Sequence, residues 1–154
     1  MSKVLVAGIG NVFFGDDGFG VEVAQRLAGT LPPDAKVEDY GIRAVHLAFE
    51  LSQYEACIVA DCMPRGGTPG TLYVVVPEID GTRAKPPDAH GIDIASVLDT
   101  VQEISGTLPR IVIVGCEPET IEPGMQLSPS VAAAVPGAIA LIRDLVDNQA
   151  WRTS

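Results

Sequence analysis

Residues 8–20 read GIGNVFFGDDGFG and decide how the chain begins to fold. They connect a short apolar run, residues 3–7, to residues 19–28, whose apolar positions repeat with the period of a helix. Glycines at a strand-to-helix turn permit tight backbone conformations and the close approach of a ligand. The stretch therefore predicts a buried strand, a glycine-rich turn and a helix at the start of a layered α/β domain.

The glycine spacing invites comparison with the dinucleotide fingerprint G-x-G-x-x-G, but the chain departs from it. Phe13 stands where the third glycine would be, and Asp16 and Asp17 follow in the same turn. Carboxylates at a helix N-terminus compete with a pyrophosphate for the same backbone N–H groups. The turn suits a cation or another positively charged group better than a phosphate.

Short Val/Ile-rich runs alternate with longer amphipathic segments, which predicts one α/β domain over residues 1–154. The predicted strands are residues 3–7, 36–40, 56–61, 71–76 and 110–115, and the predicted helices are residues 19–28, 43–52, 92–105 and 129–147. About nine residues join the third strand to the fourth, too few for a parallel crossover. We therefore expect a mixed, mostly parallel five-stranded sheet with an antiparallel fourth strand.

The composition is that of an acidic, well-packed domain. Apolar residues make up 47% of the chain and charged residues 19%, which argues against disorder. The formal net charge of −10 repels phosphates, so neither nucleic acid nor an anionic membrane is expected as a partner. The longest apolar run, residues 131–142, is shorter than the roughly 20 residues of a membrane span. Three cysteines without a C-x-x-C pair indicate a reducing cytoplasm.

Three residues with metal-ligating side chains fall at one edge of the predicted sheet. Asp17 follows the first strand, Asp61 ends the third, and His90 precedes the helix at residues 92–105. Ligands of open α/β sheets bind at the carboxyl ends of the strands, where the strand order reverses. Two carboxylates and one imidazole form an open set of oxygen and nitrogen donors suited to a divalent first-row metal ion.

Taken singly, each of these residues also has an ordinary structural explanation. Asp17 is a typical acid at a helix start, Asp61 could cap the following turn, and His90 could be a loop histidine. Cys62 could act as a nucleophile with His90 as its base, or be a small buried hydrophobe. It is their convergence on one edge that favours a metal site.

Other polar residues near this edge have open roles. Asp39 could shape the site or only a turn, and His46 fits a partly exposed helix position. Three acids follow the fifth strand: Glu117, Glu119 and Glu122. They could form a solvated face or contact the substrate. Ser128, directly before Pro129, predicts the N-cap of the last helix.

Four motifs together resemble the family of [NiFe]-hydrogenase maturation endopeptidases: GIGNVFFGDDGFG, IVADC, HGIDIASVL and GCEPETIEPGMQLSP. They lie in the family's order between residues 8 and 129. The resemblance implies a three-layer α/β/α sandwich of the phosphorylase/hydrolase-like kind. It implies an aspartic-type endopeptidase that removes the C-terminal extension of a hydrogenase large-subunit precursor once nickel is installed. Asp17, Asp61 and His90 would then contact nickel supplied by the substrate, with no organic cofactor.

Two other functions remain open at this point. One is a nickel-binding chaperone that transfers the metal without cutting anything, and the other is a cysteine hydrolase using Cys62. The chain has neither an H-E-x-x-H helix nor a Ser-His-Asp order that would indicate a different hydrolase.

Overall fold

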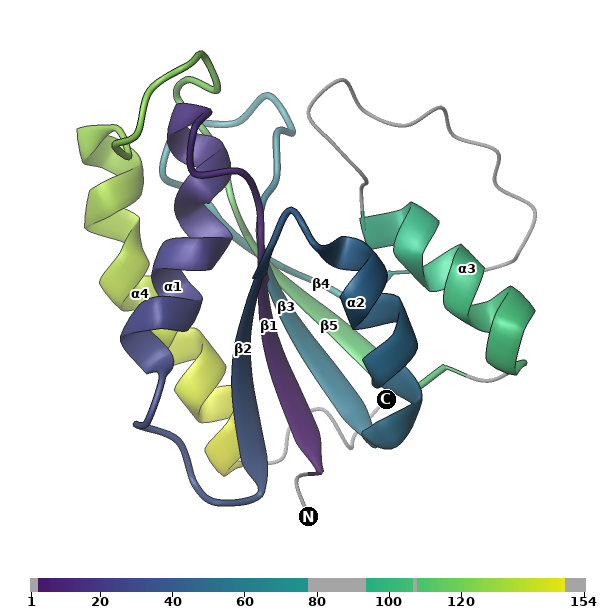
Figure 1. The fold of residues 1–154 in the computed structure, drawn as a ribbon. Coiled ribbons are helices and arrows are strands. Elements are labelled where there is room, and N and C mark those ends of the chain that lie inside the picture. Colours follow the sequence, from purple (N-terminus) through teal and green to yellow (C-terminus); the bar gives the residue numbers. More distant parts are fainter. Residues whose placement is uncertain (1–2, 78–93, 107, 149–154) are drawn as a thin grey trace.

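The computed structural model describes residues 3–77, 94–106 and 108–148, and it forms a five-stranded sheet between two layers of helices (Figure 1). The strands lie in the order β2-β1-β3-β5-β4. They are β1 (Val4–Ile9), β2 (Ala35–Gly41), β3 (Ala56–Cys62), β4 (Leu72–Val75) and β5 (Arg110–Cys116). The helices are α1 (Phe19–Leu27), α2 (Ala44–Glu50), α3 (Ile94–Ser105) and α4 (Pro129–Asp147), with short 3-10 turns at Gly15–Gly18 (η1) and Leu51–Gln53 (η2).

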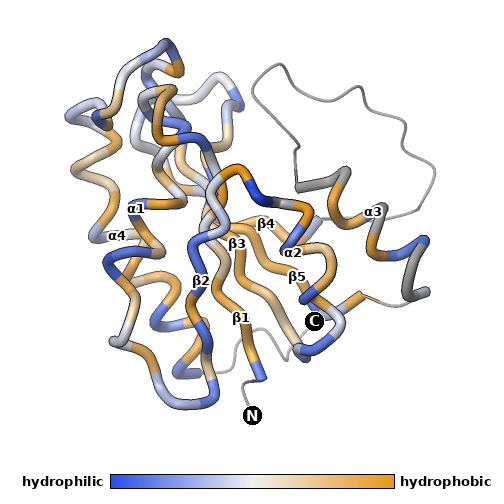
Figure 2. Tube along the Cα trace, in the orientation of Figure 1, coloured by the Kyte–Doolittle hydropathy of each residue, from blue (hydrophilic) through white to orange (hydrophobic). Residues whose placement is uncertain are grey.

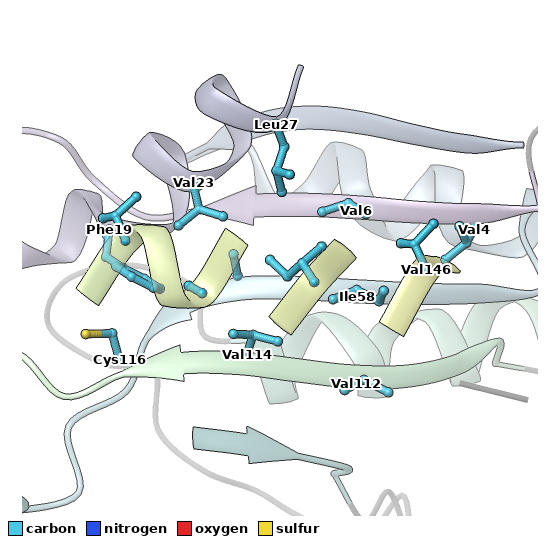
Figure 3. Close-up of a cluster of buried hydrophobic side chains, with 14 of the residues drawn as sticks. Val4, Val6, Phe19, Val23, Leu27, Ile58, Val112, Val114, Cys116 and Val146 are labelled. Atoms are coloured by element: carbon cyan, nitrogen blue, oxygen red, sulfur yellow. The ribbon is translucent and has the colours of Figure 1, made fainter. Parts of the chain in front are cut away.

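The two helix layers bury separate cores against the two faces of the sheet. Helices α1 and α4 lie together on one face, and α2 and α3 lie together on the other (Figure 1). The first core joins residues such as Phe19, Ile58 and Val135, and Figure 3 shows part of it between α1, α4 and the strands. The second includes Leu47 and Leu98. Because strands β1, β3 and β5 serve both cores, Figure 2 shows them largely as hydrophobic.

The predicted sheet is confirmed, with shifts at the ends of its elements. Strand β4 pairs antiparallel with β5, and the other neighbouring strands are parallel, as the short link from β3 to β4 required. The helix predicted at residues 43–52 is divided into α2 and the turn η2. Residues 92–93 of the predicted third helix lie outside the described residues.

Close backbone packing at β1 and β3 explains the glycines at residues 8 and 20. A Cβ atom on Gly8 would lie 2.2 Å from the carbonyl oxygen of Gly20. One on Gly20 would lie 2.1 Å from that of Ala60. Helix α1 therefore rests directly on the backbone of both strands, where no side chain fits.

Helix α4 differs from its predicted start in one detail. Ser128 occupies the N-cap position, but its side chain makes no capping hydrogen bond to the helix. By length and composition, α4 is long and apolar enough to cross a membrane, with a mean hydropathy of 1.4. It also contributes five buried residues to the first core: Val131, Val135, Ala138, Ile142 and Val146. Such burial is how a core helix uses an apolar stripe.

Candidate active site

The carboxyl edge of the sheet brings Asp17 and Asp61 to the place where the strand order reverses. Chain connections lead from β1 to β2 on one side, while β3 lies on the other side of β1. Asp17 lies in η1, directly after β1, and Asp61 is the penultimate residue of β3, in register with Gly115. Figure 1 shows the connections at this edge gathered at the upper end of the sheet. Strands β1 and β3 are neighbours, so Asp61 at the end of β3 and Asp17 in the turn after β1 lie at the same edge of the sheet, where ligands of open α/β sheets bind.

The local backbone orients Asp17. Its Oδ2 atom accepts a hydrogen bond from the backbone N–H of Asn11, 2.9 Å away. The side chain of Asn11 in turn accepts the N–H of Phe13 at 2.9 Å, which closes the turn before η1. Asp17 is half-buried, so its carboxylate is held in place and still lies at the molecular surface.

Burial and the charges of Asp61 and Asp17 all affect the pKa of Cys62. Burial raises the pKa of its thiol, and the negative charges of Asp61 and then Asp17 raise it further. The thiol therefore stays protonated at neutral pH, whereas a cysteine nucleophile must be a thiolate. This environment opposes the use of Cys62 as a nucleophile and indicates that both acids lie within electrostatic reach of it.

His90 lies outside the described residues, so the predicted set of two acids and one histidine stays a prediction. Within residues 3–77, 94–106 and 108–148, no group of three His, Cys, Asp or Glu side chains is placed to hold a metal ion. Asp17 and Asp61 supply two carboxylates at the edge. A third ligand from elsewhere in the chain and others from a substrate would be needed to complete a coordination sphere.

The structure assigns the neighbouring acids Asp16 and Asp17 to different tasks. Asp16 is fully buried beneath the loop that follows β5. Its Oδ2 accepts the backbone N–H groups of Glu119 at 2.8 Å and Thr120 at 3.0 Å. From Ser128 it receives the backbone N–H on Oδ1 at 2.7 Å and the hydroxyl on Oδ2 at 2.8 Å. The hydroxyl that we expected to cap α4 therefore binds Asp16 instead.

These donors govern the ionisation of Asp16. Burial would raise the pKa of its carboxyl group. The N–H groups of Ser128, Thr120 and Glu119, together with the Ser128 hydroxyl, outweigh burial and hold the pKa below its ordinary value. Asp16 is thus ionised, and it anchors the turn that carries Asp17 to the loop after β5.

Glu117 is a second buried carboxylate that the sequence did not single out from its neighbours. Its Oε1 accepts the N–H groups of Arg65 at 2.9 Å and Gly67 at 3.0 Å, and the hydroxyl of Tyr73 at 2.7 Å. Its Oε2 lies 3.3 Å from the N–H of Gly66. The Tyr73 hydroxyl and these N–H groups hold the pKa of Glu117 below its usual range. Glu117 therefore fastens the loop that leaves β3 beside Asp61, and it is not part of a solvated face.

The remaining polar candidates take minor roles. Glu119 and Glu122 are exposed, and Glu119 accepts a 3.3 Å hydrogen bond from the Ser130 hydroxyl. Asp39 accepts a 3.2 Å bond from the side chain of Gln25, and His46 is exposed on α2.

Comparisons with known proteins identify the family of the chain. A family model described as hydrogenase maturation protease matches residues 21–145. The chain is 38% identical to the hydrogenase expression/formation protein HupD of Rhodobacter capsulatus, over 97% of this chain and 72% of that protein. It is 28% identical to the hydrogenase 2 maturation protease of Escherichia coli, over 89% of this chain and 86% of that protein.

Solved structures carry the same fold. The hydrogenase 2 maturation peptidase of a Thaumarchaeota archaeon superimposes with a TM-score of 0.75 at 30% identity, over 95% of this chain and 99% of that one. The hydrogenase maturating endopeptidase HybD of Escherichia coli superimposes with a TM-score of 0.82 at 25% identity, over 96% and 93% of the two chains.

Proposed function

The chain belongs to the hydrogenase maturation protease family, and from this premise we propose that it removes the C-terminal extension of a [NiFe]-hydrogenase large-subunit precursor after nickel insertion. The family makes it a peptidase that processes a hydrogenase precursor. The observation that carries the finer proposal is that Asp17 and Asp61 follow or end the neighbouring strands β1 and β3 at the carboxyl edge of the sheet.

We place nickel on the substrate side of the reaction. It would arrive in the precursor, bound in part by the precursor's own cysteines, and Asp17, Asp61 and His90 would contact it from the protease. Two carboxylates and an imidazole leave coordination positions for substrate ligands. The protease would then recognise a finished metal centre and cut only precursors that carry one.

The described residues support this task by positioning. Asp17 is held by the N–H of Asn11, and the turn that carries it rests on buried Asp16. Asp61 is fixed by its strand pairing, and the loop after it is fixed by Glu117. A rigid pair of acids can bring a metal-bearing peptide to one register, so that water attacks one peptide bond and releases a carboxylate and an amine.

The two alternative functions fit the structure less well. A nickel chaperone should close the coordination of its metal ion with its own ligands, whereas this edge offers two carboxylates among the described residues. A cysteine hydrolase needs a thiolate, and burial, together with the charges of Asp61 and Asp17, raises the pKa of the Cys62 thiol and keeps it protonated. In a reducing cytoplasm, which we propose as the location, the free thiols of Cys57 and Cys116 would remain reduced in the core.

The decisive experiment follows the mass of the host organism's large-subunit precursor with and without nickel. We expect loss of the extension only from nickel-loaded precursor, and no loss with the Asp61→Ala or His90→Ala protein. Asp144→Ala is the matched control because Asp144 is an exposed acid near the C-terminal end of α4, away from the carboxyl edge, and it should process normally. Equal trimming of nickel-free precursor would refute the recognition of nickel. Tight nickel binding by the isolated protein without any trimming would favour the chaperone.

A further inference from the structure

Large apolar side chains from three separate loops are exposed at the carboxyl edge. We call them the apolar rim and define it as Val12, Phe13, Ile42 and Met125. Their exposed fractions are 36%, 59%, 72% and 71%. The two cores bury other valine, isoleucine and phenylalanine side chains, whereas these four belong to neither core. Apolar side chains that gather on one surface from different segments mark an interaction site more strongly than scattered ones.

Backbone hydrogen bonds hold the three loops of the rim side by side. The N–H of Gly10 donates to the carbonyl of Gly41 at 3.0 Å, which ties the loop of Val12 and Phe13 to the start of Ile42. On the other side, the N–H of Gly124 donates to the carbonyl of Phe13 at 2.8 Å. The three loops that carry the rim are therefore joined to one another in the folded chain.

The rim also surrounds Asp17. The N–H that fixes the Asp17 carboxylate belongs to Asn11, the residue directly before Val12. The N–H of Gly15, two residues before Asp17, donates to the carbonyl of Gly124 at 2.7 Å, directly before Met125. A polypeptide bound at Asp17 would therefore lie close to the loops that carry the rim.

Charge on the same loops narrows the choice of partner. Glu119 and Glu122 are exposed on the loop that carries Met125. The chain as a whole has a net charge of −10, so pairing of two copies through the rim would bring like charges together. A partner with apolar residues flanked by lysine or arginine complements both features.

We propose that the apolar rim is a docking surface for the precursor polypeptide, and that it contacts an apolar patch of the precursor flanked by basic side chains. This inference rests on the proposed function and adds to it a binding surface outside the metal-contacting residues. Apolar contacts at the rim hold the substrate before and during cleavage, so they affect the apparent affinity for the precursor more than the rate of cutting.

The test measures release of the extension by mass over a range of nickel-loaded precursor concentrations. We expect Phe13→Ser and Met125→Ser each to raise KM by about tenfold or more while kcat changes by less than about twofold. The matched control is Phe49→Ser, which removes an aromatic side chain of 65% exposure at the far end of α2. It should leave both constants unchanged. For the wild-type protein, kcat/KM should also fall as salt is added, because screening weakens the charge attraction.

The outcomes separate the docking surface from the proposed function. If the wild-type protein does not trim nickel-loaded precursor, the proposed function itself fails. If the wild-type protein trims it, and Phe13→Ser and Met125→Ser behave like Phe49→Ser, the docking surface is refuted alone. A concentration-dependent dimer in sedimentation, abolished by Phe13→Ser with an unchanged KM, would assign the rim to a second copy and also refute it. Thermal melting shows whether each variant is folded. If Phe13→Ser is unfolded, the comparison uses Met125→Ser.

Discussion

The carboxylate of Asp16 and the start of helix α4 are joined at Ser128, which donates its backbone N–H to Oδ1 at 2.7 Å and its hydroxyl to Oδ2 at 2.8 Å. The two residues are 112 positions apart in the chain. Asp17, the next residue, belongs to the candidate active site. The bond therefore connects the turn that carries Asp17 to helix α4.

Single substitutions of Asp16 and Asp17 should have different effects on the stability of the fold and on precursor processing. The amide of Asp16→Asn can take two orientations. In one, its N–H₂ group replaces Oδ2, which accepts three hydrogen bonds, and in the other it replaces Oδ1 and faces the Ser128 N–H. We expect a loss of about 2–3 kcal/mol in the free energy of unfolding, because buried donors lose their partner. Asp17→Asn should cost less than about 1 kcal/mol, since an amide oxygen can still accept the N–H of Asn11.

Urea unfolding and precursor processing measure these two effects. The Asp17→Asn protein should be folded and inactive, while Asp16→Asn should lose stability and keep part of its processing activity. A stable Asp16→Asn protein would contradict the role of Asp16 as an anchor.

The low pKa of Asp16 predicts how stability depends on acidity. Its pKa in the folded protein lies below the ordinary value of 3.8, so the carboxylate stabilises the fold above that value and loses the contribution as pH falls through the folded pKa. The stability difference between the wild-type protein and Asp16→Asn should therefore be full at pH 7 and shrink below about pH 4. Urea unfolding at pH 7 and below about pH 4 measures this stability difference. An equal difference at both pH values would contradict an ionised Asp16 anchor.

Removal of the charge on Glu117 should loosen the loop after β3. In the wild-type protein the donors bind two carboxylate oxygens of Glu117, whereas Glu117→Gln leaves them one acceptor oxygen. The amide protons of Arg65 and Gly67 should therefore exchange faster by about tenfold or more. Glu119→Gln is the control, because Glu119 is exposed two residues away. Hydrogen exchange followed by mass spectrometry or NMR measures the effect. Unchanged exchange in Glu117→Gln would show that the loop is held by other contacts.

Replacement of Cys62 tests the thiol directly. Cys62→Ser keeps the size of the side chain and removes the sulfur nucleophile, and we expect processing to remain within about twofold of the wild-type rate because the thiol is protonated at neutral pH. The same precursor assay measures this. Loss of cleavage by a folded Cys62→Ser protein would restore the cysteine hydrolase as an explanation.

The contact between α1 and the sheet predicts a severe effect at Gly20. A Cβ atom there would lie 2.1 Å from the Ala60 carbonyl and 2.4 Å from the Ile9 carbonyl, both of which are backbone atoms. Gly20→Ala should therefore destabilise the protein by about 3 kcal/mol or more. Gly137→Ala is the control, because it meets only the flexible end of Leu72 and adds helix propensity to α4. Thermal melting compares the two, and equal melting temperatures would contradict the packing.

The sheet followed from local patterns in the sequence. The length of the link before β4 was enough to predict its antiparallel direction, and apolar runs located each strand to within two residues. The pairing of β1 with β3, on which the position of Asp17 and Asp61 depends, is encoded in none of these local patterns, because neighbours in a sheet are chosen by long-range packing.

Other features depended on contacts that no local pattern encodes. Asp16 and Asp17 are identical in type and adjacent, and only the donors of a loop more than 100 residues away distinguish them. Glu117 resembled Glu119 and Glu122 as one more acid after β5, and its burial under the loop of Arg65 follows from the packing of β3 against β5. The capping expected of Ser128 was wrong because a buried carboxylate competes for the same hydroxyl.

The attachment of Asp16 to Ser128 has a consequence for biosynthesis. The ribosome completes β1, α1 and the acidic turn long before residue 128 leaves the exit tunnel, so the turn emerges without its donors. Asp16 then lies in a turn without its donors Glu119, Thr120 and Ser128 until the loop after β5 and α4 have docked. A nascent chain that ends before residue 128 would accordingly present Asp17 on an unanchored turn, so we expect competence to cut only after α4 has docked.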